Sequence, residues 1–433
     1  MPLQVLSVRF NHDPTSATTD ALNIRKNLTQ PIVLPEWRRG ETLRAEDSRA
    51  AYARRAPADR GRPFTIKARF RRTAEIPPAV QIRARDPRPV EPVPTGCAGV
   101  VLWLVLGALT SFFRSVNALG DVAPRDVVFA GDESDEVLFE LPFASVDRVG
   151  VRVDDISWQW EYRAQGGAWL PFDNPTHHRI YCLPDTPNLP WGQGYDPATP
   201  GGNPLWPWTD VLDHACWWAN LSADADTAAA RVTGAVYSLG PRYITYDCPN
   251  HGRSHYTRYG LGGLGFACTE FLDRLADGPG FGRFVNCTDC SAIVITFANV
   301  LGANLRTRRM HDPQWNTSVD PLDRSLAFAL NEIAAIGTDA WTRVCPDALR
   351  PGGWGNFNYH ETPWVDAGTA AEAVYDACLK VDGDADPTTR PHVPLLVTRL
   401  PFAEYRDRLA APGPTGRGRC IPQADASDVE LMS

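Results

Sequence analysis

The sequence lacks the features that assign a chain at sight to a membrane, nucleic-acid-binding or disulfide-rich class. Its formal net charge is −8, which excludes the basic excess of a dedicated nucleic-acid binder. Ten cysteines among 433 residues are too few for a disulfide scaffold, so we expect several to be buried free thiols. No charged-then-apolar leader opens the chain. We therefore expect a cytoplasmic protein by default, with export by another route left open.

Long hydrophobic runs are also scarce, with one exception at Gly96–Phe113. These 18 residues carry no charge, which just meets the lower limit for a transmembrane helix. A proline-rich lead-in, residues 87–94, and strand-like segments on both sides favour a buried strand or a core helix instead. Membrane association is therefore not expected, although the run is borderline.

The composition and periodicity of the sequence change along the chain, which indicates two folded domains. Residues 1–62 are rich in arginine and proline with little periodicity, and we expect an irregular segment there. Short apolar strands separated by turn residues fill 63–183, which is typical of a β-sandwich-like domain. Proline and glycine mark 184–207 as a linker. Helical spacing followed by strand patterns predicts an α+β domain over 208–402, and a loose tail over 403–433.

One strand of the front domain is strongly aromatic. Ile156, Trp158, Trp160 and Tyr162 alternate with polar residues, so their side chains share one face. Such a face serves either as core or as a platform for a sugar ring, and we expect core.

The stretch Asn286–Gly302 has the pattern of a buried helix with a thiol in its first turn. Asn286 is a good N-cap, and Asp289, three residues on, suits a capping box. Apolar residues recur at helical spacing through the segment, and a glycine supplies the stop. Cys287 therefore lies where the helix dipole and the free first-turn amides favour a thiolate. The sequence predicts a reactive cysteine.

A cysteine nucleophile needs a histidine within hydrogen-bond reach and a carboxylate or amide that orients the ring. Among the nine histidines, His360 lies in a strand-like run of the second half, and Asp376 lies in an equally apolar run that follows it. Adjacent antiparallel strands would bring the two side chains together, and a carboxylate among strand residues requires a partner. We therefore expect His360 and Asp376 to pair.

The helix resembles the nucleophile helix of the transglutaminase-like domain of the papain-type thiol enzymes. In that family the cysteine opens a helix that reads Cys-x-Asp-x-(Ala/Ser) and ends in Leu-Gly fifteen residues after the cysteine. Here the pattern is kept by Cys287, Asp289 and Ser291. Leu301 and Gly302 keep the spacing.

The resemblance extends to the base. The family's aspartate follows its histidine by sixteen residues, as Asp376 follows His360. The match covers residues 208–385, about 40% of the chain, and it implies helices packed on an antiparallel sheet. Two departures bear on substrate shape: Cys290 stands where the family has an aromatic residue, and Glu361 where it often has a small one.

The resemblance implies that Cys287 is the nucleophile, His360 the base and Asp376 the orienting group of an acyl transfer on an amide. The substrate would be a protein or peptide, and no cofactor is implied. Water would resolve the thioester in a peptidase or deamidase, and an amine would do so in a transglutaminase. Trp218 and Cys290 are candidates for the walls of the substrate cleft, and core packing is the alternative for Trp218.

Three other interpretations use the same residues. Cys287 and Cys290 form a Cys-x-x-Cys pair at a helix start, which is the arrangement of thioredoxin-like redox sites. Cys248 and His251 together with that pair make a Cys/His set that suits zinc. The family also includes proteins that keep the fold without activity, so a binding or structural role stays open.

Overall fold

The computed structural model describes residues 2–12, 20–87, 117–194, 205–249, 252–260, 263–314, 326–338, 341 and 355–432. It divides into two compact units. The first comprises Met1–Lys26 and Gln30–Pro184, and the second comprises Asn27–Thr29 and Asp185–Ser433. The apolar run Gly96–Phe113 lies outside the described residues. Within them, no helix is both long and apolar enough to cross a membrane.

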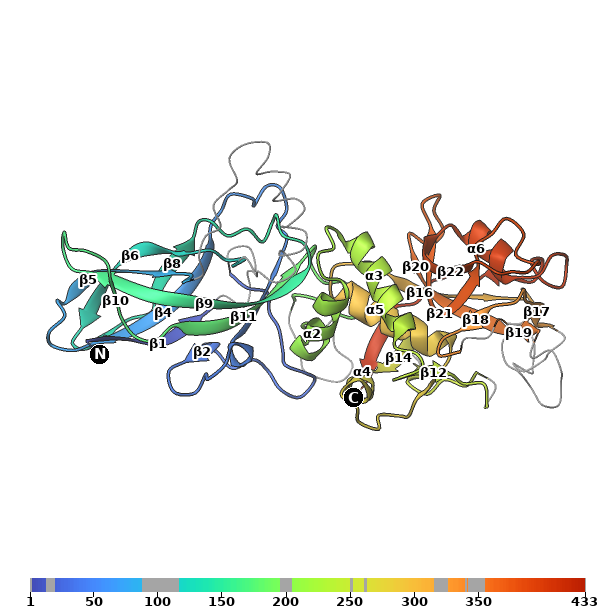
Figure 1. Ribbon diagram of the computed structural model, residues 1–433, viewed down its shortest axis with the longest axis horizontal. Coiled ribbons are helices and arrows are strands. Elements are labelled where there is room, and N and C mark those ends of the chain that lie inside the picture. The colour runs from blue at the N-terminus through green and yellow to red at the C-terminus, as the bar shows by residue number, and fades with distance from the viewer. Residues whose placement is uncertain are drawn as a thin grey trace. The chain divides into compact units, whose positions relative to one another are not determined.

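The first unit is built on a curled sheet whose strands follow the order β2-β1-β4-β7-β6-β5-β9-β11-β3, with β10 paired to β9 and β8 to β4 (Figure 1). Backbone hydrogen bonds connect all these strands into one sheet. The sandwich that the sequence predicts would instead have two separate sheets. The strands, with one short 3-10 helix η1 (Ala45–Asp47), are β1 (Leu3–Arg9), β2 (Trp37–Arg38), β3 (Arg49–Ala53), β4 (Phe64–Arg72), β5 (Ala79–Arg85), β6 (Val122–Ala130), β7 (Glu133–Ser134), β8 (Val137–Leu141), β9 (Arg152–Arg163), β10 (Leu170–Pro171) and β11 (Thr176–Leu183).

The aromatic face of β9 lies in the core of this unit, which confirms the prediction. Trp158 and Trp160 have no exposed surface. Trp160 makes an edge-on contact with Phe70 of β4 at a centroid distance of 5.4 Å. Because these rings are enclosed by the sheet, they are not a platform for a sugar.

The expectation of an irregular segment over 1–62 is wrong, since β1, β2 and β3 all lie there. The pairing of β1 with β4 shifts register between Val5 and Ser7, and this irregularity interrupts the alternation that marks a strand. Strand β3 is rich in alanine, a residue with little strand preference, and it is stabilised by parallel pairing with the distant β11.

The second unit packs helices on a mostly antiparallel sheet, so the chain is of the α+β class. Its main sheet has the order β18-β21-β20-β16-β23, with β22 paired to β21. The helices are α2 (Thr209–Trp218), α3 (Ala225–Ser238), α4 (Cys268–Leu275), α5 (Cys287–Asn299) and α6 (Phe402–Leu409). The strands are β12 (Thr245–Tyr246), β13 (Thr257–Gly260), β14 (Gly263–Ala267), β15 (Phe284–Val285), β16 (Arg306–His311), β17 (Phe328–Ala329), β18 (Ala334–Ala335), β19 (Asn356–Phe357), β20 (Tyr359–Val365), β21 (Ala373–Asp382), β22 (Pro394–Leu400), β23 (Ile421–Pro422) and β24 (Val429–Met432).

Helix α5 is the centre of this unit. It contacts β20 and β21 of the main sheet, and also α2 and α3 (Figure 1). Every residue of the helix is buried. The chain leaves it through Gly302, which has φ 91° and lies so close to Asp185 that an added Cβ would come within 2.4 Å of the Asp185 Cβ. A glycine is therefore needed at the point where the sequence predicts the helix stop.

The segment 403–433 is not a loose tail. Helix α6 buries Phe402, Tyr405 and Leu409, which share one face. Beyond it, β23 pairs with β16, and β24 runs parallel to β14. The polar composition of the segment suggests exposed chain, whereas its order comes from pairing with strands more than a hundred residues earlier.

Candidate functional site

The first turn of α5 has the predicted capping box. The Asp289 amide donates to Asn286 Oδ1 at 3.0 Å, and the Asn286 amide donates to Asp289 Oδ2 at 3.2 Å. Cys287 is the first helical residue, is 4% exposed and carries a free thiol. The helix N-terminus, with its unpaired amides and the positive end of its dipole, therefore surrounds this thiol.

Asp289 also fastens a neighbouring loop to the start of the helix. Its carboxylate accepts hydrogen bonds from the amides of His255 at 2.9 Å and Tyr256 at 3.0 Å, and from Thr257 Oγ1 at 2.7 Å. Burial raises the pKa of Asp289 despite these bonds. The aspartate of the Cys-x-Asp pattern is thus an anchor for the chain around the thiol.

The structure brings His360 and Asp376 together. Strands β20 and β21 are antiparallel neighbours, and His360 Nε2 lies 3.1 Å from Asp376 Oδ2. Both side chains are buried, with exposed fractions of 0% and 1%. The second carboxylate oxygen, Oδ1, accepts from the amides of Cys378 at 2.7 Å and Leu379 at 3.2 Å. Asp376 is therefore held in one orientation with each oxygen occupied.

The electrostatics of His360 follow from these neighbours. Burial by itself would lower the pKa of the imidazole, but the Asp376 carboxylate and the adjacent Cys287 thiol outweigh it and raise the pKa of His360 to about 10. Ring nitrogen Nδ1 is buried and has no hydrogen-bond partner among the described residues. With Nε2 engaged by Asp376, Nδ1 is the nitrogen left for exchange of a proton with the thiol.

A phenyl ring fixes the plane of the imidazole. Phe357 of β19 stacks on His360 with centroids 5.2 Å apart and an interplanar angle of 7°. Phe357 in turn contacts Phe328 of β17 edge-on at 6.1 Å. This apolar cover keeps water from the imidazole face and strengthens the electrostatic effect of Asp376.

Sequence reasoning missed a second set of residues, which is centred on Glu361. Its buried carboxylate accepts from Thr288 Oγ1 at 2.9 Å and from Thr307 Oγ1 at 2.8 Å, and also from the hydroxyl of Tyr259. Thr288 directly follows Cys287 in α5. Glu361 thus connects the first turn of α5 to three strands, which explains why a large residue occupies this position.

Arg309 balances the charge of Glu361. Its guanidinium lies 3.5 Å from the carboxylate and sits over the rings of Tyr259 and Tyr359, at 4.6 Å and 4.5 Å from their centroids. Burial would lower the pKa of Arg309, but Glu361 and the two tyrosines raise it. The sequence signal that could have revealed Glu361 is Arg309 itself, because an arginine in a buried strand requires a carboxylate partner.

Of the two residues expected to line a cleft, Trp218 packs away from the thiol and Cys290 packs against the sheet. Trp218 packs on Phe297 with centroids 4.8 Å apart. Phe297 is ten residues beyond Cys287, about 15 Å along the helix axis, so the structure does not bring Trp218 to the thiol. Cys290 is 1% exposed, and its thiol contacts that of Cys378 on β21. It therefore faces the sheet.

The zinc interpretation loses support at Cys248. Cys248 is disulfide-bonded, so its thiolate is not free for a metal, and His251 lies outside the described residues. Among the described residues, no group of three or more His, Cys, Asp or Glu side chains is arranged so that it could hold a metal ion. Cys287 and Cys290 are both free thiols, which is also the state of a reduced Cys-x-x-Cys pair.

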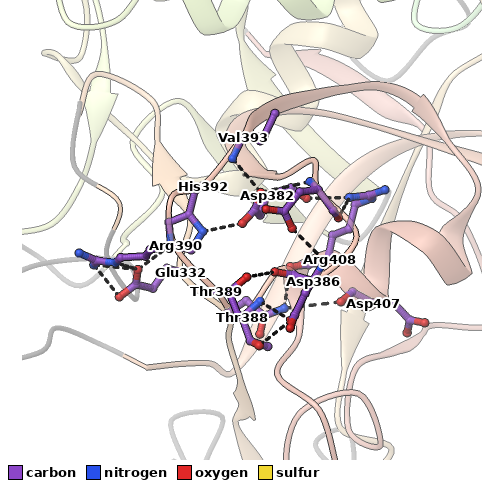
Figure 2. Close-up of polar contacts among 12 residues, drawn as sticks. Glu332, Asp382, Asp386, Thr388, Thr389, Arg390, His392, Val393, Asp407 and Arg408 are labelled. Carbon is purple, nitrogen blue, oxygen red and sulfur yellow. Dashed lines mark hydrogen bonds and ion pairs between the residues drawn. The ribbon is translucent and has the colours of Figure 1, made fainter.

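A further polar cluster lies at the far end of β21 (Figure 2). His392 Nδ1 lies 2.5 Å from Asp382 Oδ2, and its Nε2 lies 2.7 Å from Glu332 Oε2. Arg390 adds two hydrogen bonds of 2.9 Å to Glu332. Burial would lower the pKa of His392, but the two carboxylates raise it. Because both ring nitrogens are engaged, this histidine connects strands and has no nitrogen left for proton exchange.

Comparison with known proteins adds a distant likeness. No family model matches the chain, and no curated protein does. Among solved structures, the crystal structure of red sea bream transglutaminase is similar with a TM-score of 0.34 and 12% sequence identity. The likeness covers 77% of this chain and 50% of that one, so this chain spans about half its length. We draw no function from so distant a likeness.

Proposed function

We propose that the protein is a cysteine-dependent acyltransferase that acts on amides of proteins or peptides through Cys287, His360 and Asp376. The observation that carries the proposal is the buried His360–Asp376 hydrogen bond of 3.1 Å beside a thiol at a helix N-terminus. The raised pKa of His360 adds support, because an imidazolium next to the thiol favours the thiolate. The motif spacing shared with transglutaminase-like enzymes points the same way.

The reactive form is the ion pair in which the proton of Cys287 Sγ resides on His360 Nδ1. The thiolate attacks the amide carbonyl carbon, and the resulting oxyanion accepts a hydrogen bond from the Cys287 backbone N–H. As the C–N bond breaks, His360 Nδ1 returns the proton to the leaving amine and a thioester remains on Sγ. Water or a second amine then attacks the thioester, His360 takes the proton of that nucleophile, and Sγ leaves as the thiolate.

Asp376 acts on this sequence through His360. A carboxylate at Nε2 keeps that nitrogen protonated, so Nδ1 is the basic nitrogen that faces the thiol. It also stabilises the imidazolium that forms during attack. Glu361 contributes by holding the turn that carries the thiol, through its bond to Thr288.

The test measures iodoacetamide alkylation of each cysteine against pH, with peptide mass spectrometry as the readout. In the wild type we expect Cys287 to react well below pH 8, and in His360→Ala we expect that reactivity to be lost. His214→Ala is the matched control, because this half-buried imidazole packs on Trp218, which lies away from the thiol. If Cys287 reacts no faster than an ordinary thiol, the proposal fails.

A reactive thiol would then be assayed for its reaction. Peptide amides and glutamine-containing peptides would be offered with and without an added primary amine. Release of ammonia or of a peptide amine without incorporation indicates hydrolysis, and incorporation of the added amine indicates transfer.

A catalytically silent fold with a binding role is the second candidate. It is favoured by the burial of both partners, because Cys287 is 4% exposed and His360 is not exposed at all. A substrate carbonyl must reach Sγ, so this candidate predicts a thiol that ordinary alkylating reagents label slowly at every pH. The same alkylation profile separates the two candidates.

A further inference from the structure

We propose that Tyr405 of α6 is a positioning residue for the His360–Asp376 pair, one that orients the carboxylate and sets how strongly it acts on the imidazole. The inference deepens the proposed function, and its catalytic meaning rests on that function. The coupling between Tyr405 and His360 is nevertheless measurable without any turnover.

The geometry supports this role directly. Tyr405 has no exposed surface, and its hydroxyl donates to Asp376 Oδ2 at 2.7 Å. His360 Nε2 contacts the same oxygen at 3.1 Å. The Tyr405 ring also stacks near the imidazole with centroids 6.3 Å apart and an interplanar angle of 30°. One side chain therefore contacts both members of the pair.

The hydroxyl completes the set of donors around the carboxylate. Oδ1 accepts from the amides of Cys378 and Leu379, so Oδ2 is shared between the hydroxyl and the imidazole. A carboxylate that accepts several hydrogen bonds is stabilised as the anion. Burial and the nearby carboxylate raise the pKa of Tyr405 well above its ordinary value, so its hydroxyl stays a donor at every working pH.

The sign of the coupling follows from competition at Oδ2. A hydroxyl that donates to this oxygen withdraws part of its charge from the imidazolium. Removing the hydroxyl should therefore strengthen the Asp376–His360 interaction and raise the pKa of His360. A residue that merely filled space would leave that pKa unchanged.

Other titratable groups around the pair contribute to the same equilibrium. On α5 and β21 these are thiols that face the imidazole or the carboxylate, and a further thiol faces the Tyr405 hydroxyl. The groups are Cys287, Cys290, Cys378 and Cys420. Because the hydroxyl of Tyr405 can be removed without changing any of them, its effect can be isolated.

The test is an NMR titration of the His360 imidazole in the full chain carrying Cys287→Ser, which removes the coupled thiol. We expect Tyr405→Phe to raise the imidazole pKa by about half a unit or more, consistent with loss of one hydrogen bond to a charged group. Tyr375→Phe is the matched control. Tyr375 neighbours Asp376 on β21, is equally buried, and its hydroxyl has no hydrogen-bond partner in the part of the chain that the structure describes.

A second variant guards against failure to fold. Replacing Tyr405 by 3,5-difluorotyrosine keeps the ring and makes the hydroxyl a stronger donor, so we expect the imidazole pKa to fall. Opposite shifts in the two variants, with none in Tyr375→Phe, support the inference. An unchanged pKa in both Tyr405 variants, or shifts of the same sign, would overturn it.

The outcome is separable from that of the proposed function. If the His360 pKa moves as expected while Cys287 alkylates as an ordinary thiol, the coupling stands and the acyl-transfer proposal falls. If Cys287 is reactive and the Tyr405 variants leave the imidazole unchanged, the enzyme proposal stands and Tyr405 is only a packed side chain.

Discussion

Among the residues that the structure describes, each unit buries one histidine completely, and the two side chains have opposite charge preferences. The hydrogen bonds of His178, in the first unit, are to neutral hydroxyls: Ser48 Oγ lies 2.8 Å from Nδ1 and Thr176 Oγ1 lies 2.9 Å from Nε2. Burial lowers the pKa of His178 to about 3. For His360 the same burial is outweighed by Asp376, and its pKa is raised to about 10. Both histidines are fully buried, so the groups around each imidazole determine whether it is charged.

The difference gives the two units pH dependences of opposite sign. Below pH 6.5, His360 is protonated in both the folded and the unfolded chain, so its stabilisation is fully present and is lost as the pH rises through about 10. His178 is neutral in both states above pH 6.5. As the pH falls, the unfolded chain binds a proton that the folded chain excludes until about pH 3, so stability is lost.

The largest expected effect on the thiol comes from removing the charged partner of His360. In Asp376→Asn we expect alkylation of Cys287 at neutral pH to slow by roughly 10- to 30-fold, because without the imidazolium the thiolate fraction falls to the few per cent of an ordinary thiol. The measurement is the second-order rate constant with iodoacetamide. Asp382→Asn, on the same strand but bonded to His392, should leave the rate unchanged. Equal rates in wild type and Asp376→Asn would show that the carboxylate does not govern the thiol.

A second contrast concerns Glu361, a buried carboxylate whose role is structural and does not involve proton transfer. Glu361→Gln should destabilise the second unit by roughly 3–5 kcal/mol, because Arg309 is left as a buried charge without its compensating carboxylate. Denaturant unfolding would measure it. The double variant Glu361→Gln/Arg309→Met should recover part of the loss. If Glu361→Gln costs no more than the exposed-pair control Glu332→Gln, the buried ion pair has no structural importance.

The opposite pH dependences can be measured within one sample. Hydrogen exchange should show β20 and β21 losing protection as the pH rises from 6.5 to about 10, with the loss abolished in Asp376→Asn. In β9 and β11 we expect the loss on the acid side, with a limiting slope of about 1.4 kcal/mol per pH unit. Uniform loss across both units at either extreme would refute the contrast.

Glu36, in the first unit, shifts the pH at which the loss of stability on the acid side begins. Burial raises the pKa of Glu36 to about 7, although the amides of Phe10 and Asn11 donate to it. Between pH 7 and 4.5 the folded chain therefore binds a proton at Glu36 that the unfolded chain does not, which stabilises it. This gain offsets the His178 term, so we expect the net loss to start below about pH 4.5 in the wild type and near pH 6.5 in Glu36→Gln.

The smallest effect is expected at the half-buried histidine of Figure 2. His392→Gln should cost about 1 kcal/mol or less, because Glu332 and Arg390 are partly exposed to solvent, although its other partner, Asp382, is buried. Its pKa is raised by Asp382 and Glu332 against the effect of burial, so its contribution is present below pH 6.5 and lost above it. The measurement is hydrogen exchange of the β22 amides in the variant at pH 6 and pH 8. A free-energy cost larger than that of Glu361→Gln would contradict this prediction.

Much of the second unit was predictable from local pattern. The capping residues Asn286 and Asp289 and the apolar spacing that follows them predict α5 within a few residues of its observed ends. Strand-like apolar runs predict β20 and β21, and so the pairing that brings His360 to Asp376. In the first unit the same approach missed β1, because an irregular register at Val5 breaks the alternation, and the catalytic roles stay predictions.

The sequence by itself determined where the thiol sits, because a cap, a helical period and a stop act within a few residues of one another. Only the tertiary structure decided the charges around it. Tyr405 reaches Asp376 across 29 residues, and Tyr259 reaches Glu361 across 102. Those contacts leave no local pattern in the chain. Yet the electrostatic energy of a buried group depends on which donors and charges lie within a few ångströms of it, and folding alone brings them there.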